Sequence, residues 1–307
     1  MSIITLTMNP AIDVSMHIHQ LISGPKLRGR NPTYEPGGGG INVSRVIHEL
    51  GGRAQAIYTA GGPTGETLKN LLKKKHIDQR CIPINGSTRE NIMVLEETSS
   101  RLYRLVMPGP EISEAEQSAC IDILKTLDSC PAYMVISGSL PTGVSSDFYI
   151  RVIHELKACG TKIILDTKAD TLKDVISEGV YLIKPNMREL STLAGKDLDE
   201  EKQQEQHAHQ LVSEGKAKIV VLSLGAAGVL VVSEEMKQRF RAPSVPIKSR
   251  VGAGDSTLGA ITLALSQGRS LKEAVQYGIA AGSAAVMTSG TQLCRRSDVE
   301  HLFAQMS

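Results

Sequence analysis

The amino-acid sequence predicts an α/β protein in which helices cover both faces of a mostly parallel sheet. Short runs of apolar and β-branched residues alternate with segments whose apolar residues recur at helical spacing. This alternation is typical of a parallel sheet with crossover helices, and strands buried on both faces read as nearly continuous apolar runs. Six such runs are expected as strands: residues 3–8, 54–60, 134–137, 162–166, 182–184 and 219–223.

Two stretches interrupt this rhythm and predict a second, small β-sheet. Residues 11–35 contain no convincing helical pattern, and residues 91–107 read as two strands around a turn at residues 98–100. The sequence therefore predicts a β lid beside the main sheet, built from roughly residues 11–35 and 88–107.

The length of the chain allows one large domain or two smaller ones. The 307 residues are 41% hydrophobic, enough for a sizeable core. The alternation of strands and helices runs through most of the chain and passes into helical patterns from residue 253 to about 287 and again from 297. We expect a single domain over residues 1–307.

Charge and aromatic content limit the classes of partner. Lys and Arg number 34 against 32 Asp and Glu, so the formal net charge of +2 gives no reason to expect nucleic acid or anionic membranes. Aromatic residues make up only 3%, which disfavours a base-stacking platform. No apolar stretch approaches the ~18 residues of a membrane span, and the N-terminus lacks the basic segment of a signal peptide. We expect a soluble cytoplasmic protein with neither kind of partner.

The five cysteines are scattered and contain no C-x-x-C pair. They are Cys81, Cys120, Cys130, Cys159 and Cys294. An odd number without a recognisable framework is typical of reduced thiols in a cytosolic protein, and we expect all five to be reduced.

Polar residues follow several of the expected strands. Ligands of open parallel sheets bind outside the carboxyl ends of the strands. The polar positions found there are Asn9, Ser137, Asp166, Lys184-Pro185-Asn186 and Ser223. This edge of the sheet is therefore the expected ligand site.

Several common motifs are absent. The P-loop pattern fails because Lys196 and Lys216 are not followed by Ser or Thr, and the dinucleotide fingerprint fails at Thr257. Neither H-E-x-x-H nor G-x-S-x-G occurs. Mononucleotide chemistry would need another device.

The stretch SRVGAGDSTLGA, residues 249–260, is the best candidate for that device. Unobstructed N–H groups at Gly252, Ala253 and Gly254 would form an anion pocket at a helix start, suited to a transferring phosphoryl group. Asp255 could then accept a proton from an attacking hydroxyl. The alternative is that Asp255 only caps the helix and the glycines only pack it closely.

The stretch KPNMREL, residues 184–190, is a candidate for metal binding. Asn186 and Glu189 are three residues apart and share one side of a helical turn. Their oxygens suit Mg²⁺, held through water because this ion keeps much of its hydration. The alternative is that Glu189 is an ordinary acid at a helix N-terminus.

The combination of these motifs resembles the phosphofructokinase B family of carbohydrate kinases, within the ribokinase-like superfamily. The glycine cluster Gly38-Gly39-Gly40 with Asn42 fits the first family signature, and Gly252 to Asp255 followed by Gly259 fits the second. The N-x-x-E element and the stretches NPAID, GSLP and SLG stand in the family's order, from about residue 3 to 294.

The resemblance implies a ribokinase-like three-layer sandwich with a β lid, and it implies roles for individual residues. Asp13 and Asn42 would hold sugar hydroxyls, and Gly38 and Gly39 would let the backbone approach the sugar, as glycines without Cβ atoms allow. Asp255 would be the base, and residues 252–254 would stabilise the charge on the γ-phosphoryl group. The residues implied for Mg-ATP are Lys184, Asn186, Glu189, Ser223, Gly225, Gly228, Ser249 and Val251.

Within the family, the sequence resembles the branch that acts on sugar phosphates, namely the minor 6-phosphofructokinases, 1-phosphofructokinases and tagatose-6-phosphate kinases. Arg89 in TRENI, Arg104 in YRLVMPG and Lys26 in GPKLRG supply the positive charge that a phosphorylated substrate needs. Lys26 is expected near the substrate phosphate or the subunit contact. Ser139 in GSLP is implied as a further substrate contact.

The resemblance implies ATP-dependent phosphorylation of a ketohexose phosphate, with fructose 6-phosphate giving the 1,6-bisphosphate as the first expectation. Tagatose 6-phosphate or fructose 1-phosphate is the alternative substrate, because one or two contacts can decide among such isomers. A sugar-phosphate-binding regulatory protein without turnover is the alternative of another class.

The resemblance also implies a homodimer formed through the β lid, which would cover an exposed sheet edge. Ser249, Val251 and Ser283 are compatible with a K⁺ site, whereas Thr288 and Gln292 depart from the Asn and Arg of the most similar branch. Arg250 is a further departure, since the family usually has a smaller residue there.

Overall fold

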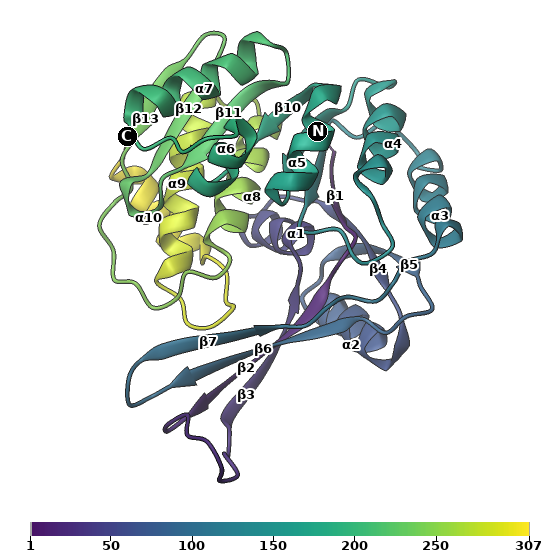
Figure 1. Cartoon of the computed structure of the whole chain (residues 1–307), viewed down its shortest axis with the longest axis vertical. Coiled ribbons are helices and arrows are strands. Elements are labelled where there is room, and N and C mark those ends of the chain that lie inside the picture. Colours follow the sequence, from purple (N-terminus) through teal and green to yellow (C-terminus); the bar gives the residue numbers. More distant parts are fainter. Residues whose placement is uncertain (1, 307) are drawn as a thin grey trace.

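The computed structural model describes residues 2–306 and contains a nine-stranded sheet in the order β13-β12-β11-β10-β9-β8-β1-β4-β5 (Figure 1). All neighbours from β5 to β11 are parallel, whereas β12 and β13 are antiparallel to their neighbours. The strands are β1 (Ile3–Thr7), β4 (Gln55–Ala60), β5 (Asp78–Pro83), β8 (Tyr133–Ser137), β9 (Lys162–Asp166), β10 (Val180–Ile183), β11 (Ala217–Ser223), β12 (Val229–Ser233) and β13 (Lys237–Phe240).

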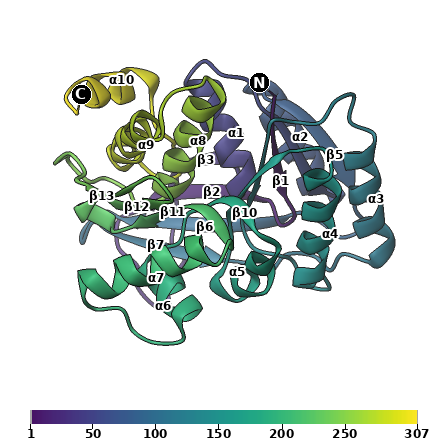
Figure 2. The same cartoon turned by 90° about the horizontal axis from the view of Figure 1, so that it is seen from above.

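Helices cover both faces of this sheet, as Figure 2 shows from above. One face carries α1 (Gly39–Glu49), α2 (Gly62–Lys74), α8 (Ala253–Ser266), α9 (Leu271–Val286) and α10 (Arg296–Ala304). The other carries α3 (Glu114–Lys125), α4 (Ser146–Lys157), α5 (Ala169–Val175), α6 (Met187–Ala194) and α7 (Glu201–Ser213). Short 3₁₀ turns follow at Ile176–Glu178 and Gly225–Ala227.

The core is split into two layers by the alternation of side chains along each strand. In β8, Tyr133 and Val135 join the core under α1, α8 and α9, whereas Met134 and Ile136 join the core under α3 to α7. Successive strand residues point to opposite faces. The continuous apolar runs therefore supply both layers, and the predicted three-layer α/β fold is confirmed.

A separate four-stranded sheet, the lid, projects from one side of the body (Figure 1). It consists of β2 (Ala11–Ile18), β3 (Arg30–Gly37), β6 (Arg89–Glu96) and β7 (Arg101–Val106) in the order β3-β2-β6-β7. Strand β2 is parallel to β6 and antiparallel to β3. The predicted hairpin around residues 98–100 is present as β6 and β7.

All six expected strands are present, but three strands of the main sheet were not predicted. Strand β5 reads DQRCIP and lies at the sheet edge, where its mixed polarity gives no buried-strand pattern. Strands β12 and β13 form an antiparallel extension after the last parallel strand, outside the alternation on which the prediction relied. No helix among residues 2–306 is long and apolar enough to cross a membrane.

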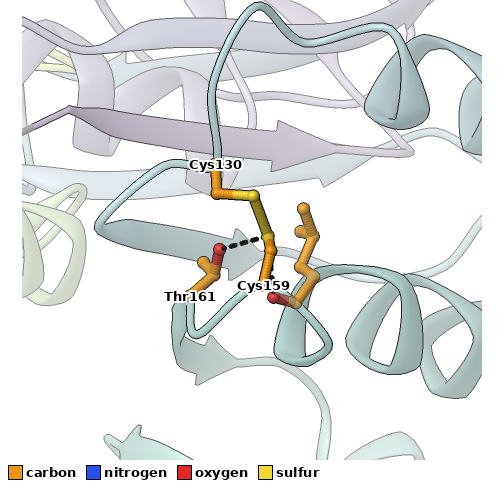
Figure 3. The surroundings of a disulfide bond; sticks show 4 residues. Cys130, Cys159 and Thr161 are labelled. Atoms are coloured by element: carbon orange, nitrogen blue, oxygen red, sulfur yellow. Dashed lines mark hydrogen bonds between the residues drawn. A yellow bond between two sulfur atoms is a disulfide. The ribbon is translucent and has the colours of Figure 1, made fainter.

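The expectation that all five cysteines are reduced is wrong. Cys130 and Cys159 form a disulfide with a Cα–Cα distance of 6.0 Å, beside Thr161 (Figure 3). The two residues precede the neighbouring parallel strands β8 and β9, so the fold brings them together at the amino end of the sheet although 29 positions separate them. Sequence spacing carries no trace of that proximity. The free cysteines of the described chain are Cys81, Cys120 and Cys294.

Candidate active site

The glycine cluster forms the start of α1, packed against the carboxyl ends of β1 and β8. Gly38 has a φ of 116°, and a Cβ there would lie 2.7 Å from Thr7 Cγ2. At Gly39 a Cβ would overlap the Ser137 hydroxyl and lie 2.9 Å from the backbone N of Gly138. These glycines therefore bring a helix N-terminus onto the sheet edge. Their expected contact with a sugar stays a prediction.

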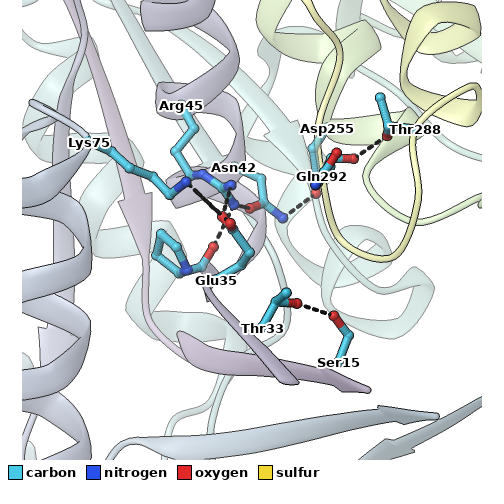
Figure 4. Close-up of polar contacts among 10 residues, drawn as sticks. Ser15, Thr33, Glu35, Asn42, Arg45, Lys75, Asp255, Thr288 and Gln292 are labelled. Atoms are coloured by element: carbon cyan, nitrogen blue, oxygen red, sulfur yellow. Dashed lines mark hydrogen bonds and ion pairs between the residues drawn. The ribbon is translucent and has the colours of Figure 1, made fainter. Parts of the chain in front are cut away.

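Asp255 lies in the first turn of α8, directly after the predicted anion pocket. Gly252 precedes the helix with a φ of 73°, a left-handed conformation that glycine adopts readily. The side-chain amide of Asn42 donates a hydrogen bond of 2.8 Å to Asp255 Oδ2 (Figure 4). The two signatures, 213 positions apart in the sequence, thus meet in one contact.

The electrostatic surroundings of Asp255 favour proton transfer near neutral pH. Burial and the nearby carboxylate of Asp166 raise the pKa of Asp255 to about 6, while the Asn42 hydrogen bond and Lys184 act in the opposite direction. At pH 7 such a carboxylate is mostly ionised and can accept a proton. These surroundings are those of a general base rather than of a surface helix cap.

Lys184 lies at the anion pocket and is paired with a carboxylate. Its Nζ is 3.3 Å from Asp166 Oδ2, and a Cβ at Gly254 would lie 3.2 Å from the same nitrogen. Although burial lowers the pKa of Lys184, Asp166 and Asp255 raise it more, so the net shift is upward. The ammonium group is therefore charged beside the turn that would receive a phosphoryl group. The sequence singled out Asp166 only by its place at a strand end.

Asn186 and Glu189 form a reciprocal cap at the start of α6. Asn186 Oδ1 accepts from the Glu189 N–H at 3.0 Å, and Glu189 Oε2 accepts from the Asn186 N–H at 2.8 Å. The pKa of Glu189 is raised by burial and, in part, by Asp166. The carboxylates of Asp166 and Glu189 are hard oxygen donors of the kind that suits a divalent cation. No group of three His, Cys, Asp or Glu able to hold a metal occurs within residues 2–306, so a cation here would also need water and phosphate ligands.

The predicted sugar side contains Asp13 and several amides. Asn91 Nδ2 donates to Asp13 Oδ1 at 2.8 Å, and Asn9 Nδ2 donates to Ser139 Oγ at 3.2 Å. Within the described residues, Asn9 Oδ1, Asn91 Oδ1 and Arg89 Nε are buried without a hydrogen-bond partner. Buried polar atoms are rarely left unpaired, so this cluster fits a polar ligand. Asn91 had no signal in the sequence beyond its place in the lid.

The three predicted phosphate-binding cations lie in different settings. Arg89 donates to the backbone oxygens of Asn9 and Met107, both at 3.0 Å, and so joins the lid to the main sheet. Arg104 is exposed on β7; burial raises the pKa of Asp13, and the charge of Arg104 is among the influences that partly offset this rise. Lys26 belongs to the exposed loop between β2 and β3, and this loop lies at the end of the lid away from the body (Figure 1). Within one chain Lys26 is therefore not brought to the other site residues.

The residues predicted to bind the nucleotide border the same edge of the sheet. Ser223 ends β11 and forms a bridge with Asn186. Gly225, with a φ of 60°, has open space where a Cβ would stand, whereas at Gly228 a Cβ would lie 2.8 Å from the backbone N of Ala242. Gly228 is thus required by packing against its own chain.

The loop before α8 is held by Ser249. Its hydroxyl donates to the Gly290 carbonyl at 2.8 Å and accepts from the Val251 N–H at 3.2 Å. Arg250 is exposed. Thr288 Oγ1 lies 2.7 Å from the carbonyl oxygens of both Ala285 and Gln292 (Figure 4).

Comparison with known proteins agrees with this geometry. Residues 3–298 match the model of the pfkB family of carbohydrate kinases. The chain belongs to this family. Among pfkB kinases, the ATP-dependent 6-phosphofructokinase isozyme 2 of Mycobacterium tuberculosis is 44% identical over 301 residues, covering 98% of this chain and 88% of the relative. The isozyme 2 of Escherichia coli is 40% identical over 306 residues, covering 99% of each.

Solved structures of pfkB kinases have the same fold. Phosphofructokinase-2 from Escherichia coli in complex with substrates and products has a TM-score of 0.95 at 40% identity, covering 100% of this chain and 99% of that one. The same protein has been solved with fructose-6-phosphate, with potassium and as a tetrameric inhibited form, with TM-scores of 0.94, 0.95 and 0.94 over 99% of each chain and identities of 39%, 40% and 39%. Ribokinase from Arabidopsis thaliana, at 19% identity and a TM-score of 0.77 over 98% of each chain, shares the fold, which confirms the ribokinase-like architecture.

Proposed function

We propose that the protein transfers the γ-phosphoryl group of ATP to fructose 6-phosphate, giving ADP and fructose 1,6-bisphosphate. The observation that carries this proposal is the buried carboxylate of Asp255, held by Asn42 at the glycine turn that starts α8. The relatives at 44% and 40% identity bear the name ATP-dependent 6-phosphofructokinase isozyme 2, which supports this pair of substrates.

In the proposed reaction, the free primary hydroxyl of the sugar attacks the γ-phosphorus. The new P–O bond forms as the bond from the γ-phosphorus to the bridging oxygen of ADP breaks, and the hydroxyl proton passes to Asp255. A base with a pKa of about 6 is ionised before this step and can release the proton to water afterwards. The N–H groups of residues 252–254, at the positive end of the α8 dipole, face the charge on the transferring group.

Lys184 and the carboxylates at α6 organise the phosphates in this proposal. The ammonium of Lys184, beside Gly254, neutralises phosphate charge. Asp166 and Glu189 would hold Mg²⁺, with Asn186 contributing through water, and the ion supplies charge neutralisation between the phosphates when bound. Ser223, Gly225 and the loop around Ser249 would border the nucleotide.

Asp13 and Asn42 would receive the sugar hydroxyls, and the unpaired atoms of Asn9, Asn91 and Arg89 mark the wall against which a polar ligand fits. Arg89 and Arg104 would face the substrate phosphate. Lys26 would reach a phosphate from the lid of a second subunit, because the loop between β2 and β3 that carries it lies at the end of the lid away from the body. Homodimer formation through the lid is thus part of the proposal.

Two finer features belong to the same proposal. Potassium would lie near Ser249, Val251 and Ser283, and replacing K⁺ by Na⁺ in the assay tests its contribution. Since ATP and fructose 6-phosphate are phosphorylated metabolites of the cytoplasm, a cytoplasmic location is part of the same proposal.

The test is ADP release with Mg-ATP against a panel of fructose 6-phosphate, tagatose 6-phosphate, fructose 1-phosphate, free fructose and ribose. We expect selection for fructose 6-phosphate and loss of turnover in Asp255→Asn. Selection for another phosphorylated ketose would change the substrate but keep the chemistry, whereas turnover of free sugars alone would remove Arg89 and Arg104 from the site. Silence across the panel in a folded protein that binds fructose 6-phosphate would establish a binding protein instead.

A further inference from the structure

Arg45 is a buried arginine next to the candidate base, and neither the sequence motifs nor the proposed reaction gives it a role. Its side chain is only 9% exposed. It lies on α1 one turn after Asn42, and its Nη1 donates to Asn42 Oδ1 at 3.1 Å and to the Pro36 carbonyl at 2.7 Å. Its Nη2 donates to Glu35 Oε2 at 2.5 Å (Figure 4). The guanidinium thus joins the lid strand β3 to the residue that contacts Asp255.

The contact between Arg45 and Asn42 decides which way the Asn42 amide points. A side-chain amide has an accepting oxygen at one end and a donating NH₂ group at the other. Since Arg45 can only donate, it holds Oδ1, and Nδ2 is then the end that faces Asp255 Oδ2 at 2.8 Å. In the flipped amide, Oδ1 would face the Asp255 carboxylate, which also accepts hydrogen bonds. Nδ2 would face the guanidinium, which also donates, so both hydrogen bonds would be lost.

We propose that Arg45 is a positioning residue for phosphoryl transfer, because it fixes the Asn42 amide in the orientation that supports the ionised carboxylate of Asp255. This inference rests on the proposed role of Asp255 as the base. Arg45 itself contacts neither substrate in the proposal and acts through Asn42.

The charges around Asp255 indicate what the loss of Arg45 would do. Carboxylates approach from β2 (Asp13) and from the end of β9 (Asp166), and both raise the pKa of Asp255. Lys184, after β10, and the amide of Asn42 lower it. Burial lowers the pKa of Arg45, and Glu35, Asp13 and Asp255 oppose this shift, so the guanidinium also attracts the Asp255 carboxylate. Removing Arg45 would therefore weaken two influences that keep Asp255 ionised.

Arg45 lines a cavity of about 410 Å³. Glu35 is held there from the far side by Lys75, with Nζ 2.9 Å from Oε2, and both residues line the cavity together with Arg45, His48 and Arg295. This volume admits a small cation. An alkylguanidinium ion could therefore reach the place of the missing group in a truncated variant.

The first experiment compares Arg45→Met with Arg239→Met in the kinase assay with fructose 6-phosphate. Displaced catalytic groups cost about 10²-fold, so we expect kcat to fall by about that factor in Arg45→Met, with a smaller change in KM. The acid limb of the pH profile of kcat/KM should move up by about one unit, as expected when an opposite charge and a hydrogen bond are lost. Arg239, on β13, donates to Glu205 and Gln204 of α7 rather than to Asn42 or Asp255 and is the matched control, expected to change neither quantity.

Two further variants separate positioning from folding. Arg45→Ala should recover activity when methylguanidinium is added, and Arg45→Lys, which keeps the charge but loses the fork, should keep the wild-type acid limb with reduced kcat. The double variant Asn42→Ala/Arg45→Met should be much less impaired than two independent losses would make it, because residues that act through one another are not additive. These readouts do not depend on the Met variant being as stable as the wild type.

The outcomes distinguish this inference from the proposed function. If Asp255→Asn were active, Asp255 could not be the base, and the inference about Arg45 would fail with it. If Asp255→Asn is inactive, an unchanged kcat and acid limb in Arg45→Met would overturn the Arg45 inference alone. Additive losses in the double variant would overturn it as well, since Arg45 would then act independently of Asn42.

Discussion

At the scale of single residues, the role proposed for Asp255 conflicts with the stability of the folded protein. A carboxyl that is more basic in the folded than in the unfolded protein binds more protons when folded. The pKa of Asp255 rises from the ordinary 3.8 to about 6, chiefly through burial. Its contribution to stability is therefore lost as the pH rises between these two values, and above pH 6 the folded protein bears the full cost of an ionised carboxylate.

We predict that Asp255→Asn is more stable than the wild type at pH 7.5, by as much as about 3 kcal/mol from a shift of two pKa units. The advantage should shrink toward pH 4, where the folded wild type carries the proton and the unfolded carboxyl, with its pKa of 3.8, is about half protonated. Urea unfolding at both pH values measures it, with Asp122→Asn, on the exposed face of α3, as the control. A variant that is less stable than the wild type at pH 7.5 would contradict the buried, ionised state of Asp255.

Residues with a local signature could be placed from the sequence, and those defined by long-range contacts could not. The glycine turn before Asp255 and the N-x-x-E pair can be recognised in the sequence, because their residues are only a few positions apart. Arg45 and Asn91 do not, because their partners Glu35 and Asp13 come from other strands. A buried arginine reads in the sequence as one more charged residue of an amphipathic helix.

At the scale of secondary-structure elements, the periodicity of apolar residues predicted the parallel sheet. The features that it missed are those that this periodicity does not mark. Strands β12 and β13 were missed because an antiparallel hairpin has no crossover helix to mark it. The disulfide was missed because it depends on the order of β8 and β9 within the sheet. Pairing between loops that precede neighbouring strands follows from topology rather than from spacing.

We predict that the Cys130–Cys159 bond stabilises the body of the protein without affecting turnover, because it joins the amino ends of β8 and β9 and the site lies at the carboxyl ends. Cross-linking residues 29 apart typically contributes about 2–4 kcal/mol to the free energy of unfolding. Cys130→Ser should lose stability of this order in urea and keep kcat, whereas Cys81→Ser should keep both. Alkylation of the unreduced, denatured protein should label three cysteines; labelling of all five would show that the bond does not form.

At the scale of the whole molecule, most of the large apolar side chains that are exposed in the described residues lie on the lid or its loops. Leu105, Val106 and Met107 are 56%, 62% and 42% exposed at the end of β7, and Tyr34 on β3 is 51% exposed. In the loop between β2 and β3 that carries Lys26, Leu21, Ile22 and Leu27 are 44%, 46% and 38% exposed. Contiguous apolar side chains beside unpaired strand edges are typical of a protein interface. In a single chain these apolar side chains of the lid are therefore exposed to solvent.

We predict that Leu105→Lys/Val106→Lys converts a lid-mediated dimer into a 33.0 kDa monomer, because two buried ammonium groups without partners oppose association. Sedimentation equilibrium at micromolar concentration measures the change, with Ala119→Lys, on the exposed side of α3, as the control for added charge. If Lys26 serves the site of another subunit, as proposed, the monomer should also have a raised KM for fructose 6-phosphate, and Lys26→Met should raise this KM while the protein stays a dimer. A monomeric variant with wild-type KM would show that each chain forms a complete site and that the exposed surface of the lid has another purpose.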